Sequence, residues 1–381
     1  MKKTFKFTSV LLVIMMLLVT VTGCSSKKQE EDTTKVSISA SISHDEKYDS
    51  VIVEISPEDF MAAGFNFGDS CDVTFSNGYT LTDIPFYNGY YVKTGDAVVV
   101  AYPGNTIVKV ARNSADCWTP AGVDESCTVE ITLNTAGKYL ATYEALGIPY
   151  SNERSDFDSD EMFANFRAIS GGNLKENLIY RGASPVNNET NRASYVDALL
   201  EKNGINCVLD LADSQDNMDK YLASEDFASN YTKSLYEDGK VILLSMSSSY
   251  YKDSYKASVA EAVRYMLNNE GPVYIHCNEG KDRTGFVCML LEALMSASYD
   301  EMCQDYMTTY YNYYGITKED TPEKYDAVVD LYFNSFMSYL YGSDDVEVLK
   351  SADYSESARN YLTECGLTTE EIDSLVTYLS K

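Results

Sequence analysis

One ten-residue stretch carries the side chains best suited to chemistry: residues 276–285, which read His-Cys-Asn-Glu-Gly-Lys-Asp-Arg-Thr-Gly. A thiol in a tight loop that opens a helix faces backbone N–H groups, which together with the helix dipole stabilise a thiolate. The same N–H groups form a nest for a phosphate dianion. Gly280 lets the loop curl, and Arg283 can hold two phosphate oxygens at once. The pattern therefore predicts attack on phosphorus by Cys277, with no metal ion or cofactor required.

Alternating strands and helices surround this loop and predict how it is positioned. Short buried strands are expected at residues 178–181, 207–211, 241–244 and 272–276, and helices at 191–203, 255–268, 284–296, 299–314, 325–341, 355–365 and 369–380. Such alternation implies a mainly parallel sheet flanked by helices. Sites in these sheets lie beyond the carboxyl ends of the strands, so the loops after the four strands should converge there.

Residues 36–145 have a different pattern, which predicts a small all-β domain. Apolar residues alternate in 36–42, 51–55, 73–75 and 129–133, and further β-rich runs occupy 97–102 and 107–111. Turn signals such as Asn77-Gly78 separate these runs. No chemical motif occurs here, which favours a spacer or docking module. Polar residues from 151 to 161 serve as the linker, and residues 151–381 form the predicted catalytic domain.

The string from His276 to Gly285 resembles the signature of the protein tyrosine phosphatase superfamily, Cys-x5-Arg, in the bacterial branch with Lys-Asp-Arg in the loop. The resemblance covers about residues 164–317, including Leu-Ile-Tyr-Arg-Gly-Ala at 178–183 and Gly-Ile-Asn-Cys-Val-Leu-Asp-Leu at 204–211. It implies a cysteine-phosphatase fold and a phosphocysteine intermediate.

The resemblance also implies a role for each residue of the loop. Cys277 would be the nucleophile and His276 a support for its thiolate, while Thr284 would donate a hydrogen bond to the leaving thiolate. Phosphate would be bound by Arg283 together with the loop residues Asn278, Glu279, Gly280, Lys281 and Asp282.

Two segments depart from the family pattern and leave the general acid open. Related bacterial enzymes end the second strand with Asp-Leu-Arg, where this chain has Asp-Leu-Ala-Asp at 210–213. The loop after the third strand usually holds Pro-Asp, but residues 245–253 contain no proline and only one carboxylate, Asp253. We take Asp253 as the first candidate, then Glu279 or Asp282, then Asp213. A solvated or helix-capping carboxylate is the alternative for each.

The predicted function is hydrolysis of phosphotyrosine, on proteins or peptides, by a cysteine-dependent phosphatase. Lys281 supports an alternative, an inositol phosphate or phosphoinositide phosphatase, unless it merely pairs with an acid at the rim. The missing Pro-Asp favours an alternative of another class, an inactive module that binds a phospho-ligand. Tyr306, Tyr310, Tyr313 and Tyr314 recur at helical spacing, either as core or as an aromatic wall for a phenolic ring.

The N-terminus resembles a bacterial lipoprotein leader. Lys2 and Lys3 precede a short apolar run at residues 10–21, which ends in Val-Thr-Gly-Cys24. We expect residues 1–23 to be a signal peptide, Cys24 to carry lipid, and residues 24–35 to act as a tether. The protein should then work outside the cytoplasm, anchored to the bacterial cell membrane.

Composition excludes two further classes. The formal net charge is −28, which disfavours nucleic-acid partners. With only His44 and His276 in 381 residues, a histidine-built metal centre is also excluded.

Overall fold

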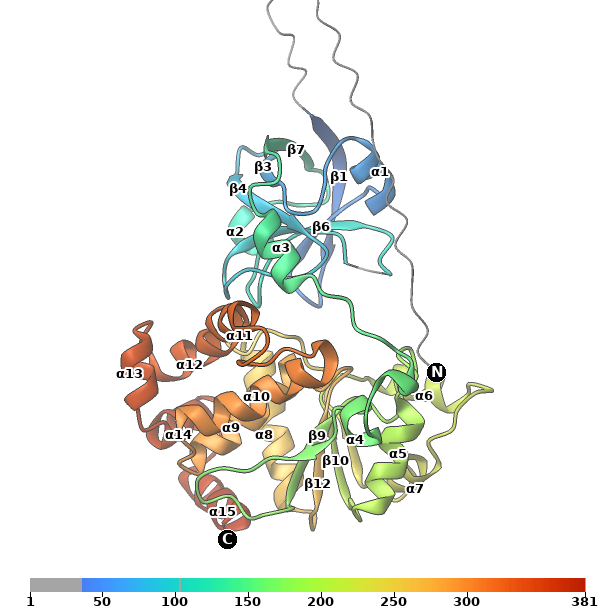
Figure 1. Ribbon diagram of the computed structural model, residues 1–381, viewed down its shortest axis with the longest axis vertical. Coiled ribbons are helices and arrows are strands. Elements are labelled where there is room, and N and C mark those ends of the chain that lie inside the picture. The colour runs from blue at the N-terminus through green and yellow to red at the C-terminus, as the bar shows by residue number, and fades with distance from the viewer. Residues whose placement is uncertain (1–35, 103, 381) are drawn as a thin grey trace, which may run out of the picture. The chain divides into compact units, whose positions relative to one another are not determined.

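The computed structural model describes residues 36–102 and 104–380 (Figure 1). Cys24 and the predicted signal peptide lie outside these residues. Within the described ranges, no helix is both long enough and apolar enough to cross a membrane. None of the cysteines in these ranges forms a disulfide.

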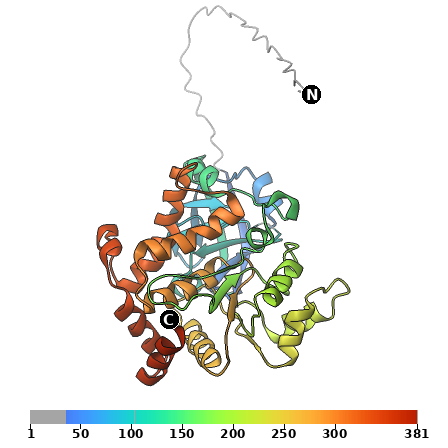
Figure 2. The same cartoon turned by 60° about the horizontal axis from the view of Figure 1, so that its bottom comes forward.

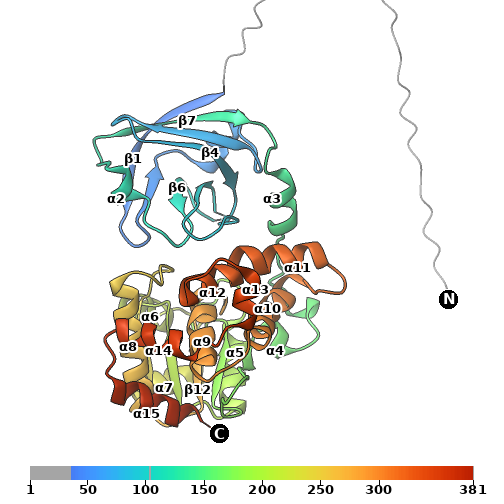
Figure 3. The same ribbon diagram turned by 90° about the vertical axis from the view of Figure 1, so that its left-hand side faces the viewer.

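The first strands close into a barrel, visible in Figure 3. Its order is β1-β2-β6-β5-β4-β3-β7, and β7 pairs with β1 to close it. Every neighbouring pair is antiparallel except β4 with β5, which is parallel. The bounds are β1 Ser37–Asp45, β2 Ser50–Val53, β3 Ser70–Phe75, β4 Thr80–Tyr87, β5 Ala97–Val100, β6 Val108–Arg112 and β7 Thr128–Thr135. This confirms the predicted all-β domain.

Alternation explains how the barrel obtains its core. Successive side chains of a strand point to opposite faces, so every second apolar residue turns inward. Val51 and Val53 on β2, and Val108 and Val110 on β6, are fully buried in one apolar cluster. Two short helices accompany the strands, α1 Pro57–Ala62 and α2 Trp118–Ala121.

The second sheet has five strands in the order β11-β10-β12-β9-β8. Its strands are β8 Arg167–Ala168, β9 Ile179–Gly182, β10 Cys207–Asp210, β11 Val241–Leu243 and β12 Val273–His276. All pairs are parallel except β8 with β9. This confirms the mainly parallel sheet.

Helices cover both faces of this sheet, as Figure 2 shows. Alternate strand residues such as Leu209 and Ile275 pack in the cluster that holds the C-terminal helices, whereas Val208 and Tyr274 pack in the cluster of α5 and α7. The helices are α3 Leu140–Leu146, η1 Arg154–Asp156, α4 Asp160–Phe163, α5 Ala193–Lys202, α6 Gln215–Leu222, α7 Asn230–Glu237, α8 Asp253–Leu267, α9 Asp282–Leu294, α10 Tyr299–Tyr314, α11 Pro322–Val328, the π-helical turn η2 Val329–Phe333, α12 Asn334–Tyr341, α13 Val346–Ser351, α14 Ser355–Glu364 and α15 Thr369–Leu379.

Helix α10 supports the site, and local signals define both its ends. Ser298 and Glu301 form a reciprocal capping box at the start, which satisfies backbone donors that the helix leaves free. Gly315 ends the helix in the left-handed conformation. The helix therefore presents Asp305, Tyr310 and Tyr313 at fixed positions behind and beside the loop described next.

Candidate active site

The predicted loop joins the last residue of β12, His276, to the first residue of α9, Asp282. The parallel register pairs His276 with Asp210 of β10 on one side and with Gly182 of β9 on the other. The loops after these strands therefore meet at one edge of the sheet, as expected. Cys277 lies at the base of the loop and is 4% exposed.

Buried donors hold the carbonyl groups on the back of the loop. The backbone N–H of Ser184 donates to the carbonyl of Asn278 (3.0 Å). The carbonyl of Glu279 accepts from Asn165 Nδ2 (3.0 Å) and from the Tyr313 hydroxyl (2.9 Å). A trans peptide directs its N–H opposite to its C=O. Carbonyls fixed behind the loop thus leave its front to N–H groups, the arrangement that binds an anion.

Arg181 completes this support from below. Its Nη2 donates to the carbonyl of Gly280 (2.8 Å), and its Nη1 pairs with the carboxylate of Asp305 on α10. Arg167 Nε binds the same carboxylate (2.7 Å). Burial alone would raise the pKa of Asp305, but the two guanidinium groups outweigh it and lower that pKa. Arg181 therefore packs behind the loop, where its side chain is 1% exposed.

Gly280 is required by a close approach between two backbones. Its φ is +70°, and a Cβ atom built on it would lie 2.2 Å from the carbonyl oxygen of Gly182. Any larger residue would push the loop away from β9 and from Arg181.

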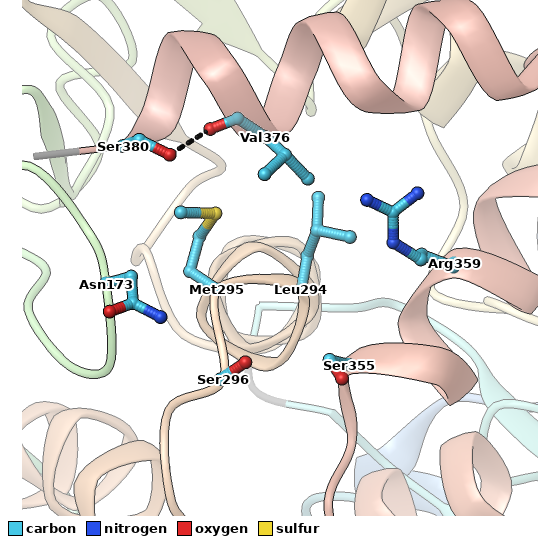
Figure 4. A pocket seen from close by; sticks show the side chains of 8 residues that line it. All are labelled: Asn173, Leu294, Met295, Ser296, Ser355, Arg359, Val376 and Ser380. Atoms are coloured by element: carbon cyan, nitrogen blue, oxygen red, sulfur yellow. Dashed lines mark hydrogen bonds between the residues drawn. The ribbon is translucent and has the colours of Figure 1, made fainter.

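A cavity of about 930 Å³ opens in front of the loop. Loop residues Asn278, Glu279, Lys281, Asp282 and Arg283 line it, together with Tyr310 and Tyr314 of α10. A smaller cavity of about 450 Å³, shown in Figure 4, is lined by none of the loop residues. Its one charged side chain, Arg359, pairs with Asp373 (2.9 Å). The larger cavity is therefore the candidate active site.

Comparison with known proteins agrees with this geometry. Residues 161–381, more than half of the chain, match the model of the tyrosine phosphatase family. The chain belongs to this family. The match extends beyond the segment at 164–317 on which the sequence resemblance rested, and includes the C-terminal helices.

Two solved structures are similar to parts of this tyrosine phosphatase family chain. One is the core catalytic domain of the PP-IP phosphatase SIW14 from S. cerevisiae, at 20% identity over 42% of this chain and 86% of that one, with a TM-score of 0.25. The other is TpbA from P. aeruginosa, at 16% identity over 54% of this chain and 87% of that one, with a TM-score of 0.22. No curated protein is significantly similar in sequence.

The four candidate acids of this phosphatase family member lie in different surroundings. Asp253 is the exposed first residue of α8, and it does not belong to the described residues that line the cavity. Asp213 is 2% exposed, is also off the cavity lining, and accepts hydrogen bonds from Tyr221 and Asn217. Burial and the neighbouring Asp210 raise the pKa of Asp213 to about 6.

The two acids inside the loop both line the cavity but differ in charge. Burial would raise the pKa of Glu279, yet the ammonium of Lys281, 3.0 Å away, and the Tyr150 hydroxyl, at 2.5 Å, outweigh it and lower that pKa. Glu279 is therefore ionised. Asp282 is exposed to the cavity, and desolvation by the surrounding cavity wall raises its pKa against the opposing effect of Lys281. Asp282 is thus the acid on the cavity wall that more readily keeps its proton.

His276 and Thr284 are buried, neutral groups at the two ends of the loop. His276 Nδ1 is 3.3 Å from the carbonyl of Cys277, and burial lowers the pKa of His276 to about 4, so the ring is uncharged at neutral pH. The Thr284 hydroxyl is fully buried and has no hydrogen-bond partner within the described part of the chain. A buried hydroxyl is stabilised once it gains a partner, which makes Thr284 available as a donor.

Sequence reasoning missed Asn165, Arg167 and Asp305 in this site. A signal existed for Asp305, because it occupies the inner face of α10 between Met302 and Tyr306, where apolar residues predominate. Asn165 offered no comparable signal, since a lone asparagine ahead of a short strand is typical of many turns.

Proposed function

We propose that this protein is a cysteine-dependent phosphatase that hydrolyses phosphate monoesters, with phosphotyrosine as the leading substrate. The supporting observation is the loop itself, whose carbonyls are held behind it while Arg283 lines the cavity at its front and Cys277 lies at its base. The thiolate of Cys277 forms a bond to phosphorus as the bond to the leaving oxygen breaks. Water then attacks phosphorus, breaks the S–P bond and releases inorganic phosphate.

Charge on the transferred group is balanced by the loop. Arg283 is the bidentate ligand of the phosphoryl oxygens, and the backbone N–H groups of residues 278–283 complete the cradle. Arg283 donates one N–H to the carbonyl of Met246 (3.1 Å), which fixes the orientation of its guanidinium. Thr284 donates to the thiolate when the S–P bond breaks, and His276 positions the backbone of Cys277.

Asp282 is our proposal for the general acid, with Asp253 retained as the alternative from the sequence. An acid must hold its proton until the leaving oxygen takes it, and a raised pKa serves that need. Asp282 combines such a pKa with a place on the cavity wall. Asp253 would have to reach the substrate through movement of the loop that precedes α8.

Turnover of p-nitrophenyl phosphate tests the proposal and separates an enzyme from an inactive binding module. We expect steady release of nitrophenol, together with hydrolysis of a phosphotyrosine peptide. If the protein binds the peptide in calorimetry yet releases no phosphate from either compound, it is a binding module.

Lys281 distinguishes phosphotyrosine from an inositol polyphosphate as substrate. Lys281→Ala should cost about 1–3 kcal/mol of transition-state stabilisation on an inositol polyphosphate, the scale of a charged hydrogen bond. The resulting fall in kcat/KM should be smaller on phosphotyrosine. Glu279→Gln is the matched control, because it removes the partner of Lys281 and keeps the ammonium. Equal losses on both substrates would mean that Lys281 only shapes the loop through its pair with Glu279.

Attachment to the bacterial cell membrane through Cys24 remains a proposal that rests on the lipobox-like sequence. Cys24→Ala should release the protein from the membrane fraction or leave it unprocessed, because the lipid would no longer be added. Mass spectrometry of the N-terminus together with cell fractionation checks this result. Normal membrane retention of the variant, with an unmodified N-terminus in the native protein, would contradict it.

A further inference from the structure

The barrel contributes side chains to the cavity in front of the phosphate loop. Tyr48, Tyr91, Tyr102 and Arg112 of the barrel line the same space as Lys281, Asp282 and Arg283. The charge of Lys281 opposes the rise in the pKa of the Tyr102 phenol, which places the two side chains within electrostatic reach of each other. The cavity therefore has a wall that does not belong to the phosphatase family match, which begins at residue 161.

Four polar contacts join the barrel to the elements around the cavity. The Tyr250 hydroxyl donates to Thr94 Oγ1 (3.0 Å), and Lys252 forms an ion pair with Asp49. The Tyr332 hydroxyl donates to the carbonyl of Tyr90 (3.1 Å), and Lys93 Nζ lies 3.1 Å from a carboxylate oxygen of Asp330. Two of these contacts come from the loop before α8 and two from η2, so the barrel is fixed at two separate places.

The charges in the cavity suit one phosphate group. Lys109 pairs with Asp45 (2.6 Å) and Lys281 with Glu279 (3.0 Å), so each of these two ammonium groups already has a carboxylate partner. The guanidinium groups of Arg112 and Arg283 donate instead to backbone carbonyls. Two such groups match the charge of one phosphate monoester, which is close to −2 at neutral pH.

The remaining lining suits a planar ring. Tyr314, Tyr150 and Tyr102 line the cavity, and Lys281 Nζ lies 5.9 Å from the centre of the Tyr314 ring. Tyr150 packs edge-on against Tyr314, with ring centres 5.7 Å apart. Aromatic side chains hold a substrate ring through offset or edge-on contacts.

We propose that the barrel is the outer wall of the substrate cavity and restricts the substrate to an aryl phosphate carried on a small molecule or a short flexible peptide. The inference rests on the proposed phosphatase function and narrows its substrate. A volume of about 930 Å³ falls in the range of small-molecule sites, roughly 300–1,000 Å³. A folded phosphoprotein would instead need an open surface of about 800 Å².

One substrate series tests this proposal: phosphotyrosine as the free amino acid, in a short unstructured peptide, and on a rigid loop of a folded domain. We expect kcat/KM for the first two to exceed that for the folded domain by at least about 100-fold, the scale of a lost near-attack geometry. Equal values across the series would overturn the barrel proposal and leave the phosphatase function intact. If the protein hydrolyses none of the three substrates and also fails to hydrolyse p-nitrophenyl phosphate, both the barrel proposal and the phosphatase function are overturned.

Tyr102→Ala tests the wall directly, with Tyr311→Ala as its matched control. The two tyrosines are similarly exposed, at 43% and 44%, but among the described residues only Tyr102 of this pair lines the cavity. Loss of one aromatic contact should raise KM for free phosphotyrosine about 3- to 10-fold with little change in kcat. Calorimetry with free phosphotyrosine on Cys277→Ser, with and without Tyr102→Ala, should show that Tyr102→Ala raises Kd by the same factor as it raises KM. Equal effects of Tyr102→Ala and Tyr311→Ala would contradict the proposal.

Discussion

Cys277→Ser is expected to abolish phosphate release, with a loss in kcat on the order of 10⁴–10⁶, as when a catalytic nucleophile is removed elsewhere. A serine hydroxyl is not ionised in this loop at neutral pH, so no nucleophile would remain. Cys127→Ser is the control, because Cys127 is a partly exposed thiol of the barrel. Steady-state kinetics with p-nitrophenyl phosphate should show full activity for this control.

The same nucleophile makes the reaction independent of metal ions. Arg283 and the backbone N–H groups supply the charge stabilisation that a metal would otherwise provide. We expect activity to survive EDTA and to disappear on treatment with iodoacetate. Activity that is lost on chelation and restored by a divalent cation would contradict this prediction.

Asp282→Asn is expected to slow hydrolysis of phosphotyrosine by about 10²–10⁴-fold, the usual contribution of a general acid. An aryl phosphate with a strongly acidic phenol should be nearly spared, because its leaving group departs without a proton. The pH dependence has a defined sign. Desolvation by the cavity wall raises the pKa of Asp282. The protonated form is the active one, and activity therefore falls as pH rises through that raised pKa. Asn at this position should remove the alkaline limb.

Asp253→Asn is the comparison that assigns the acid. Asp253, at the start of α8, does not line the cavity as Asp282 does, so its substitution should leave the alkaline limb in place. If Asp253→Asn removes the limb and Asp282→Asn does not, the prediction from the sequence is right and our proposal for Asp282 is wrong.

The strands and helices around the site were predictable because their apolar periodicity is strong. The predicted strand at 272–276 is β12, Val273–His276, and the predicted helix at 299–314 is α10 with the same bounds. Strand β4 was missed because Pro85 interrupts its pattern, which is typical of a turn or an edge. Helix α6 was missed because only Met218 in it is buried. The helix predicted at 325–341 is interrupted by the π-helical turn η2.

The site itself was predictable only where it is contiguous in sequence. Residues 276–285 lie in one loop, so their types and spacing were enough to suggest the chemistry. The support behind the loop comes from Asn165, Arg181 and Asp305, which are far apart in the chain and meet only through the packing of β9 and α10 against it. The barrel side chains on the cavity are further away still. No local pattern in residues 36–145 indicates that they face a phosphate loop.

Trapping of the covalent intermediate tests the chemistry most directly. Wild-type protein should be mixed with p-nitrophenyl phosphate, quenched in acid within the first turnovers, digested and analysed by mass spectrometry. We predict one added phosphoryl group on the peptide that contains Cys277, lost again when the quench is delayed until substrate is exhausted. A phosphoryl group on another residue, or continuing turnover with Cys277 unmodified and dispensable, would contradict the mechanism.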